Sequence, residues 1–169
     1  AGIGKSPLIA AAADDALARG FTVLRTTGVE SETLIPFAGL HQLLRPVLAQ
    51  SGCLPAAQRL ALDAAVGAES GPAPEPFLIA LAALNLLAEV ATSAPLAIIV
   101  DDVHWLDAPT HETLAFIARR MGVDPIVIVG TMRTGYGGPF AGAGLTELEV
   151  RGLDDASAQE LLAAAPVDI

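Results

Sequence analysis

The chain has 169 residues, of which 53 % are hydrophobic and 17 % are charged, and its mean hydropathy is +0.55. This composition supports one globular domain with a sizeable core, and it excludes an intrinsically disordered chain. The formal net charge is −10, so the average field repels a phosphate backbone and argues against nucleic-acid binding by this domain. Cys53 is the single cysteine, which excludes a scaffold stapled by internal disulfides.

Helical and extended segments alternate along the sequence. Apolar residues at helical spacing, with capping and stop residues at the ends, predict helices over residues 6–19, 37–50, 55–66, 76–92, 109–121 and 155–165. Runs of β-formers predict strands over residues 21–26, 96–100, 125–131 and 146–150. This order predicts an α/β fold with a mostly parallel sheet.

Local signals refine three of these elements. Pro46 is expected to kink or end the helix over 37–50. The runs 96–100 and 125–131 are almost entirely apolar, which is typical of parallel strands buried on both faces. The helix over 109–121 is expected to be capped by Asp107 or by Thr110. The longest apolar stretch, 77–91, is shorter than the roughly 20 residues that span a bilayer, so no membrane partner is expected.

The first six residues, AGIGKS, end with Gly4, Lys5 and Ser6, the close of a phosphate-binding loop pattern. Gly2 and Gly4 let backbone N–H groups approach phosphate oxygens, and Ile3 lies between them in the same loop. Lys5 supplies a charge for the outer phosphates, and the Ser6 hydroxyl suits Mg²⁺. The same tripeptide also occurs in ordinary turns. Pro7 disfavours helical geometry at Ser6, although a proline in a first helical turn breaks no hydrogen bond.

An acidic pair, Asp101 and Asp102, follows the apolar run at 96–100. Ligands of open α/β sheets bind at the carboxyl ends of strands, where one carboxylate can hold Mg²⁺ and a second can orient an attacking water. The alternative is a strand-to-helix turn in which Asp102 or Asp107 only caps a helix. The order of the two motifs along the chain, GKS and then the acidic pair, suits a P-loop NTPase.

The strand over 125–131 ends in Thr131, Met132 and Arg133. In a strand beside the acidic one, Thr131 or Arg133 lies near the outermost phosphate, where an arginine can sense whether that phosphate is present. The alternative is a solvated arginine at a strand end. The three histidines, His41, His104 and His111, have no metal-ligand spacing and are expected on helix faces or beside packed aromatic side chains.

Several long motifs together carry a family resemblance. AGIGKS, VESETLIPFAGLHQLLRPVL, IIVDDVHWLD, FIARR and TMR resemble the ATPase domain of large LuxR-type transcriptional regulators, which belong to the STAND group of P-loop ATPases, akin to the AAA superfamily. The stretch ESE-x-x-x-PFAGLHQLL-x-P is the most diagnostic, because its length has no generic reason to recur. The similarity covers nearly the whole chain.

The resemblance implies a three-layer P-loop NTPase of the ASCE or AAA-like type, with a mostly parallel sheet whose central first strand is missing from this chain. It implies an ATPase core over 1–151 with a helical insert at about 37–92, followed by the start of a helical lid at 152–169. The missing strand and first loop glycine lead us to expect a fragment of a longer protein.

The same resemblance implies ATP and Mg²⁺ as cofactors. Gly2, Ile3, Gly4, Lys5 and Ser6 then bind the nucleotide, and Ser6 and Asp101 hold the metal. Asp102 and Arg133 are the implied catalytic residues.

The implied function is a slow, cytoplasmic ATPase switch of a transcription regulator, with DNA bound through a separate helix-turn-helix and self-association of the parent protein. The alternatives are a non-catalytic interaction module with a P-loop fold, or the same domain in a cyclase or kinase.

Overall fold

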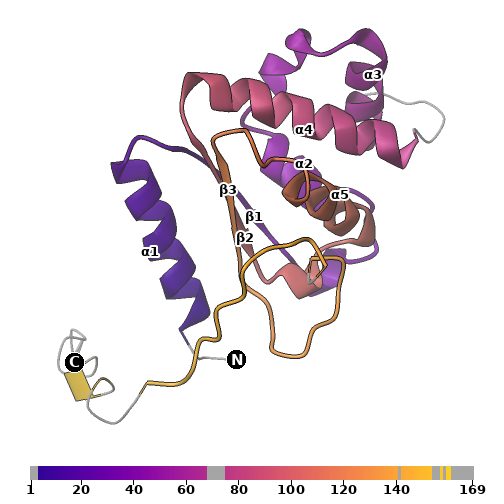
Figure 1. Cartoon of the computed structure of the whole chain (residues 1–169). Helices are drawn as coiled ribbons and strands as arrows, with labels where there is room; N and C mark the ends of the chain where they lie inside the picture. The colour runs from indigo at the N-terminus through magenta and orange to yellow at the C-terminus, as the bar shows by residue number, and fades with distance from the viewer. Residues whose placement is uncertain (1–3, 68–74, 141, 154–156, 158, 161–169) are drawn as a thin grey trace, which may run out of the picture.

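The computed structural model describes residues 4–67, 75–140, 142–153, 157, 159 and 160. Three parallel strands form a sheet in the order β1-β2-β3 (Figure 1). They are β1 (Thr22–Thr27), β2 (Leu96–Asp101) and β3 (Ile126–Gly130). The predicted α/β class and the parallel sheet are therefore confirmed.

Five of the predicted helices are present in the described part of the chain. They are α1 (Lys5–Ala18), α2 (Ala38–Leu44), α3 (Ala56–Ala65), α4 (Pro76–Ser93) and α5 (Ala108–Ala118). Three short 3-10 turns join them: η1 (Glu30–Glu32), η2 (Leu48–Cys53) and η3 (Val103–Trp105). The helix expected over 37–50 ends before Pro46, as proline predicts, and η2 replaces its second half. The helix expected over 155–165 lies mostly outside the described residues, although 157, 159 and 160 are helical.

The two faces of the sheet are covered by different helices (Figure 1). α1 packs on one face, where Ile9 and Ala13 contact Ala97 and Ile99 of β2. α2, α4 and α5 lie over the other face, with Leu96, Ile98 and Val100 in the larger core. Successive β2 side chains thus alternate between two apolar layers, which explains the continuous apolar run in its sequence.

β3 does not have the burial that its sequence predicts. Ile128 is buried, but Val127 and Val129 are 41 % and 36 % exposed. These two valines pair in register with Ala97 and Ile99, whose side chains α1 covers. The expectation of a strand buried on both faces is wrong for β3, because α1 lies over β1 and β2 and leaves this face of β3 open.

The strand expected over 146–150 is absent from the structure. These residues form no helix or strand, and Leu148 is 82 % exposed. A strand requires a hydrogen-bonded neighbour, and none of the described strands pairs with this segment. The alternating pattern alone was therefore misleading here.

α4 is the most apolar helix in the described part of the chain. By length and composition it meets the requirement for crossing a membrane, which is weak evidence by itself. It packs between α3 and α5 and contacts β2, with buried side chains along its whole length, among them Ile79, Leu86 and Val90. This packing is that of a core helix.

Asp107 joins two motifs that are far apart in the sequence. Its buried carboxylate accepts hydrogen bonds from the N–H groups of Phe37 (2.8 Å) and Gly39 (3.0 Å), at the start of α2. It also accepts from the N–H (2.9 Å) and hydroxyl (2.7 Å) of Thr110 and so caps α5 as predicted. The Thr110 hydroxyl in turn accepts from Leu40 N–H at 2.9 Å. The segment PFAGL is thereby fixed beside the turn that follows the acidic pair.

Candidate nucleotide site at the carboxyl edge of the sheet

The start of α1 and the carboxyl ends of the strands lie at the same end of the molecule (Figure 1). Thr27 of β1 pairs in register with Asp101 of β2, so these strands end together. α1 packs antiparallel to them, which brings its first turn to this edge. In α/β sheets this edge is where ligands bind.

Gly4 precedes α1 in a left-handed conformation, with φ of 92°, which glycine adopts without strain. Lys5 and Ser6 open the helix, with Lys5 half-buried and Ser6 exposed. The first N–H groups of a helix have no partner within the helix, and with its dipole they attract an anion. Gly2 and Ile3 lie outside the described residues.

Pro7 does not disturb this first turn. Ser6 and Pro7 are both part of α1, and the N–H of Leu8 donates to the Gly4 carbonyl at 3.1 Å. A proline this close to the start removes an N–H that has no helical acceptor in any case. The expectation that Pro7 disfavours helix at Ser6 is therefore wrong here.

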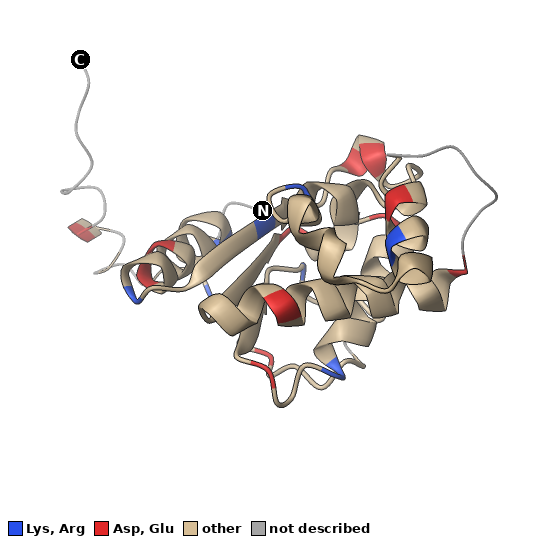
Figure 2. Ribbon diagram, turned by 90° about the horizontal axis from the view of Figure 1, so that it is seen from above, with Lys and Arg blue, Asp and Glu red and all other residues tan. Residues whose placement is uncertain are grey.

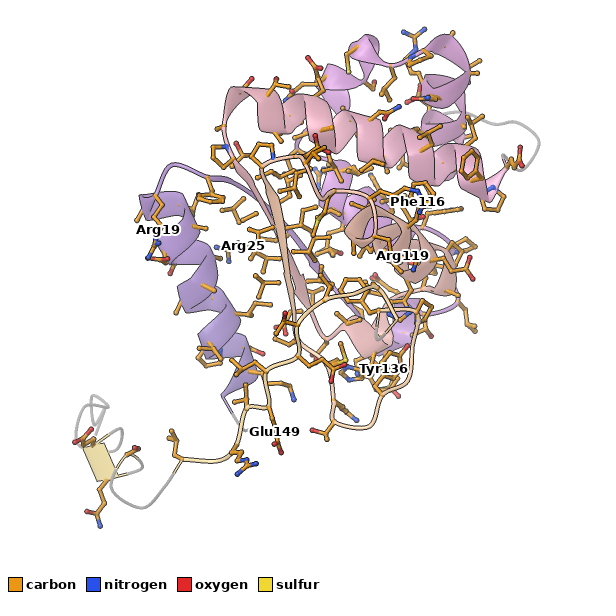
Figure 3. The ribbon with its side chains drawn as sticks, viewed as in Figure 1. Arg19, Arg25, Phe116, Arg119, Tyr136 and Glu149 are labelled. Carbon is orange, nitrogen blue, oxygen red and sulfur yellow. The ribbon has the colours of Figure 1, made fainter. Side chains whose placement is uncertain are left out.

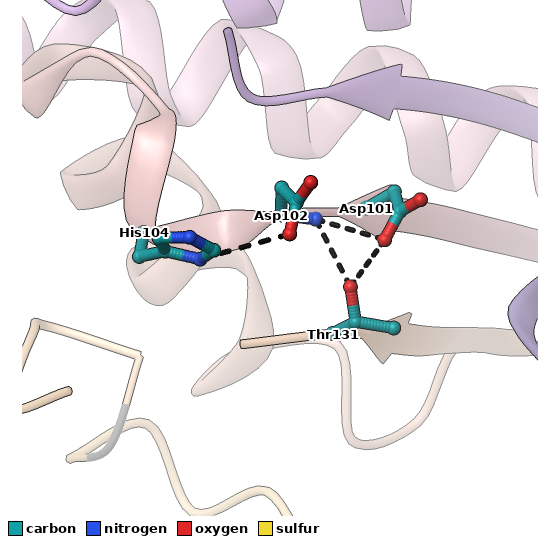
Figure 4. Close-up of polar contacts among 4 residues, drawn as sticks. All are labelled: Asp101, Asp102, His104 and Thr131. Carbon is teal, nitrogen blue, oxygen red and sulfur yellow. Dashed lines mark hydrogen bonds and ion pairs between the residues drawn. The ribbon is translucent and has the colours of Figure 1, made fainter. Parts of the chain in front are cut away.

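Asp101 ends β2 with its carboxylate held from one side (Figure 4). Its Oδ1 accepts a 3.0 Å hydrogen bond from Asp102 N–H and a short one from the Thr131 hydroxyl. The Thr131 oxygen also accepts from Asp102 N–H at 3.0 Å. Among the described residues nothing donates to Asp101 Oδ2, which leaves that oxygen available to a cation.

Asp102 adopts a left-handed backbone conformation, with φ of 48°, which aspartate tolerates better than most residues. Its side chain is 42 % exposed, and Nδ1 of His104 lies 3.9 Å from Asp102 Oδ1. The end of β1 presses against this turn. A Cβ at Gly28 would lie 2.3 Å from the Asp102 carbonyl oxygen, so only glycine fits there.

His104 belongs to an aromatic cluster behind the acidic pair. Its ring centroid lies 5.1 Å from Trp105 and 6.1 Å from Tyr136, which comes from the glycine-rich loop after β3. The Tyr136 ring, labelled in Figure 3, is also 5.8 Å from the ring of His111 of α5. The ring of His111 in turn stacks on Phe140. The loop is therefore packed against the turn that carries Asp102.

Arg133 lies on the rim of this cluster. It is exposed, and its guanidinium carbon is 5.4 Å from the Trp105 ring centroid, a cation–π arrangement. In this conformation Arg133 pairs with Trp105 rather than with a carboxylate. Arg133 thus lies beside the turn that follows the acidic pair, and its role toward a phosphate stays a prediction.

Charged groups from several elements act on the pKa of His104. Burial is the main cause that lowers the pKa of His104 below its ordinary value, and Asp102 partly opposes it. The cationic groups of Arg133 and Lys5 add to the lowering, and Asp101 opposes it. Elsewhere on the ribbon, Lys and Arg appear as separate short segments on several elements (Figure 2).

The comparison with known families decides the class. Residues 1–129 of the 169 match the family model described as AAA ATPase domain. The chain belongs to this family. No match was found among curated proteins. No match was found among solved structures either.

Membership of the AAA ATPase domain family implies that the chain binds a nucleotide, usually with Mg²⁺. The residues at the sheet edge fit such a ligand. Mg²⁺ in nucleotide sites takes one or two carboxylates together with phosphate oxygens and water, and Asp101 offers an uncommitted Oδ2. No cluster of three or more His, Cys, Asp or Glu residues that could hold another metal occurs in the described part of the chain.

Two features of this edge were not apparent in the sequence. The hydrogen bond from Thr131 to Asp101 depends on the pairing of β2 with β3, although the position of Thr131 at a strand end was a signal. The approach of His104 to Asp102 depends on the left-handed turn between them. The only sequence signal for this approach is that a histidine follows two residues after the acidic pair. That spacing does not distinguish it from a histidine that only packs against its neighbours.

Proposed function

We propose that this AAA ATPase domain binds Mg·ATP at the carboxyl edge of the sheet and hydrolyses it slowly, as a nucleotide-dependent switch. The observation that carries the proposal is that the first turn of α1, which begins with Lys5, lies at the same edge of the sheet as the end of β2, which carries Asp101 (Figure 1). Asp102 follows in the turn after β2, and Arg133 lies over Trp105 of that turn. Family membership supplies the class of ligand.

Each residue has a distinct task in this proposal. The loop that ends in Gly4 and includes Gly2 and Ile3 presents N–H groups to the phosphates, and Lys5 neutralises the outer phosphate charge. Asp101 and the Ser6 hydroxyl hold Mg²⁺, which would neutralise charge on the phosphates. The proposed metal ligands and phosphate contacts thus come from two sequence motifs. Both motifs lie at the carboxyl edge of the sheet.

The remaining two residues act on the reaction. The exposed Asp102 carboxylate orients the attacking water and accepts its proton. Arg133 turns from Trp105 toward the outer phosphate when that phosphate is present. Thr131 couples the two strands, because its hydroxyl contacts Asp101 at the base of the same site.

The wider role proposed here is that of the ATPase switch of a LuxR-type transcription regulator acting in the cytoplasm. The support is the resemblance of residues 29–48, which the structure joins to the acidic turn through Asp107. In such a regulator the nucleotide state controls DNA binding or self-association of the parent protein, and DNA is bound outside this domain.

Lys5→Ala tests the site. We expect the Kd for Mg·ATP to rise about 10- to 100-fold, because a charged hydrogen bond to phosphate is lost. The matched control is Arg19→Ala at the other end of α1, where an exposed arginine pairs with Asp15 at 2.8 Å. Fluorescent-nucleotide binding measures both variants. Equal affinity of Lys5→Ala and the parent chain would sink the assignment.

A further inference from the structure

His104 is buried without satisfying its polar atoms. Its side chain is only 6 % exposed, and neither ring nitrogen has a hydrogen-bond partner in the described structure. A buried donor that lacks an acceptor costs about 1–3 kcal/mol, so such groups normally have a partner or a task. Packing alone would be served better by an apolar ring of similar size.

The groups that surround His104 limit which residue can be the hydrogen-bond partner of its ring nitrogens. Trp105 and Tyr136 present rings at 5.1 and 6.1 Å between centroids. The Asp102 carboxylate lies 3.9 Å from Nδ1, measured to Oδ1, and its side chain makes no hydrogen bond among the described residues. The dashed line between His104 and Asp102 in Figure 4 marks this approach.

The remaining gap is short. A hydrogen bond between nitrogen and a carboxylate oxygen needs about 2.7–2.9 Å, so the separation must close by about 1 Å. The Asp102 side chain is 42 % exposed and is free to turn about its own bonds, whereas the ring of His104 is enclosed by Trp105 and Tyr136. We therefore expect the Asp102 carboxylate to move and the His104 ring to stay in place.

We infer that His104 is a positioning residue for Asp102, and that its Nδ1–H donates a hydrogen bond to the Asp102 carboxylate and fixes the direction in which that carboxylate faces the attacking water. This inference rests on the proposed function for the role of Asp102. The pairing of the two side chains does not depend on nucleotide.

The protonation state of His104 suits this task. Burial keeps the imidazole neutral by lowering its pKa, so the ring carries one N–H and donates without handing a proton to Asp102. The hydrogen of the neutral ring must then sit on Nδ1, and this tautomer is a direct experimental signature.

His111 provides the matched control. It is also buried, at 4 % exposure, its Nε2 also lacks a partner, and it packs in the same cluster against Tyr136 and Phe140. Asp107 and Glu112 are the carboxylates that act on it, and neither belongs to the acidic pair. A purely structural role for buried histidines in this cluster would affect both residues alike.

The first test is heteronuclear NMR of the histidine ring nitrogens in the full chain without nucleotide. We expect His104 to be neutral with its hydrogen on Nδ1, and its ring signals to shift in Asp102→Asn while those of His111 stay in place. A hydrogen on Nε2 of His104 would overturn the inference. So would His104 ring signals that do not shift in Asp102→Asn. Because no nucleotide is added, this result is independent of the proposed function.

The second test compares substitutes for His104 during ATP hydrolysis. The amide nitrogen of Asn can take the place of Nδ1, whereas that of Gln reaches toward Nε2. We expect His104→Asn to retain most of kcat and His104→Gln to lose about tenfold or more, with the KM for Mg·ATP unchanged, because misdirected catalytic groups lower the rate of the chemical step. His111→Gln is expected to leave kcat in place.

Either of two outcomes contradicts the inference in this second test. A loss in His104→Asn as large as in His104→Gln would mean that the ring acts by packing. Equal losses in His104→Gln and His111→Gln would mean the same. If the parent chain itself does not bind Mg·ATP, the proposed function fails, and the NMR result still decides whether the two side chains pair.

Discussion

Replacing Asp102 by asparagine is expected to lower the rate of ATP hydrolysis by about 10²- to 10⁴-fold while leaving the Kd for Mg·ATP close to that of the parent chain. The amide has nearly the same shape but cannot accept a proton from water. Asparagine also tolerates the left-handed backbone found at this position, so the turn is preserved. Phosphate release measures the rate, and calorimetry measures the affinity.

Asp14→Asn is the control for this change. Asp14 is exposed on α1, with a side chain 77 % accessible and only a 3.6 Å contact to Arg25. It is expected to alter neither rate nor affinity, since such surface pairs contribute little. Hydrolysis in Asp102→Asn at the parent rate would remove Asp102 from the mechanism. A loss of affinity equal to the loss of rate would place it among the metal-binding groups instead.

Replacing Asp107 by alanine is expected to have the largest effect on stability. Three backbone N–H groups and one hydroxyl lose their acceptor, and Asp107 is only 2 % exposed. Each buried donor left unsatisfied costs about 1–3 kcal/mol, so the free energy of unfolding should fall by at least about 3 kcal/mol. Urea unfolding followed by circular dichroism measures it.

The conformation of Phe37 explains why the start of α2 cannot compensate for the loss of the Asp107 hydrogen bonds. Phe37 precedes α2 with φ of 60°, a left-handed conformation that is strained for a bulky residue. Its N–H is held by Asp107 Oδ1, so the carboxylate maintains the strained entry to the helix. Asp14→Ala on the surface is the control and should change stability by less than about 0.5 kcal/mol. A loss below about 1 kcal/mol in Asp107→Ala would contradict this account.

The sequence was informative wherever a local signal decided the outcome. The alternation of helices with apolar runs predicts the parallel sheet, and Pro46 predicts where α2 ends. Asp107 was foreseen as a possible cap of α5. The acidic pair was placed correctly at a strand end because the apolar run of β2 stops there.

The features that were missed depend on residues distant in the sequence. The exposure of Val127 and Val129 follows from where α1 lies across the sheet, which no window of sequence contains. Residues 146–150 have the pattern of a strand and lack a neighbour. The second role of Asp107, at α2, spans about seventy residues. The approach of His104 to Asp102 cannot be predicted from the sequence, because it depends on the left-handed turn between them.

The most direct measurement of the central claim is a calorimetric titration of the chain with ATP, performed with Mg²⁺ and again with the metal removed by a chelator. We expect one ATP to bind per chain in the presence of Mg²⁺ and weaker binding without it, since Asp101 reaches the phosphates through the cation. Absence of binding by a folded chain in both titrations would contradict the account, and would favour an interaction module that keeps the P-loop fold without its ligand.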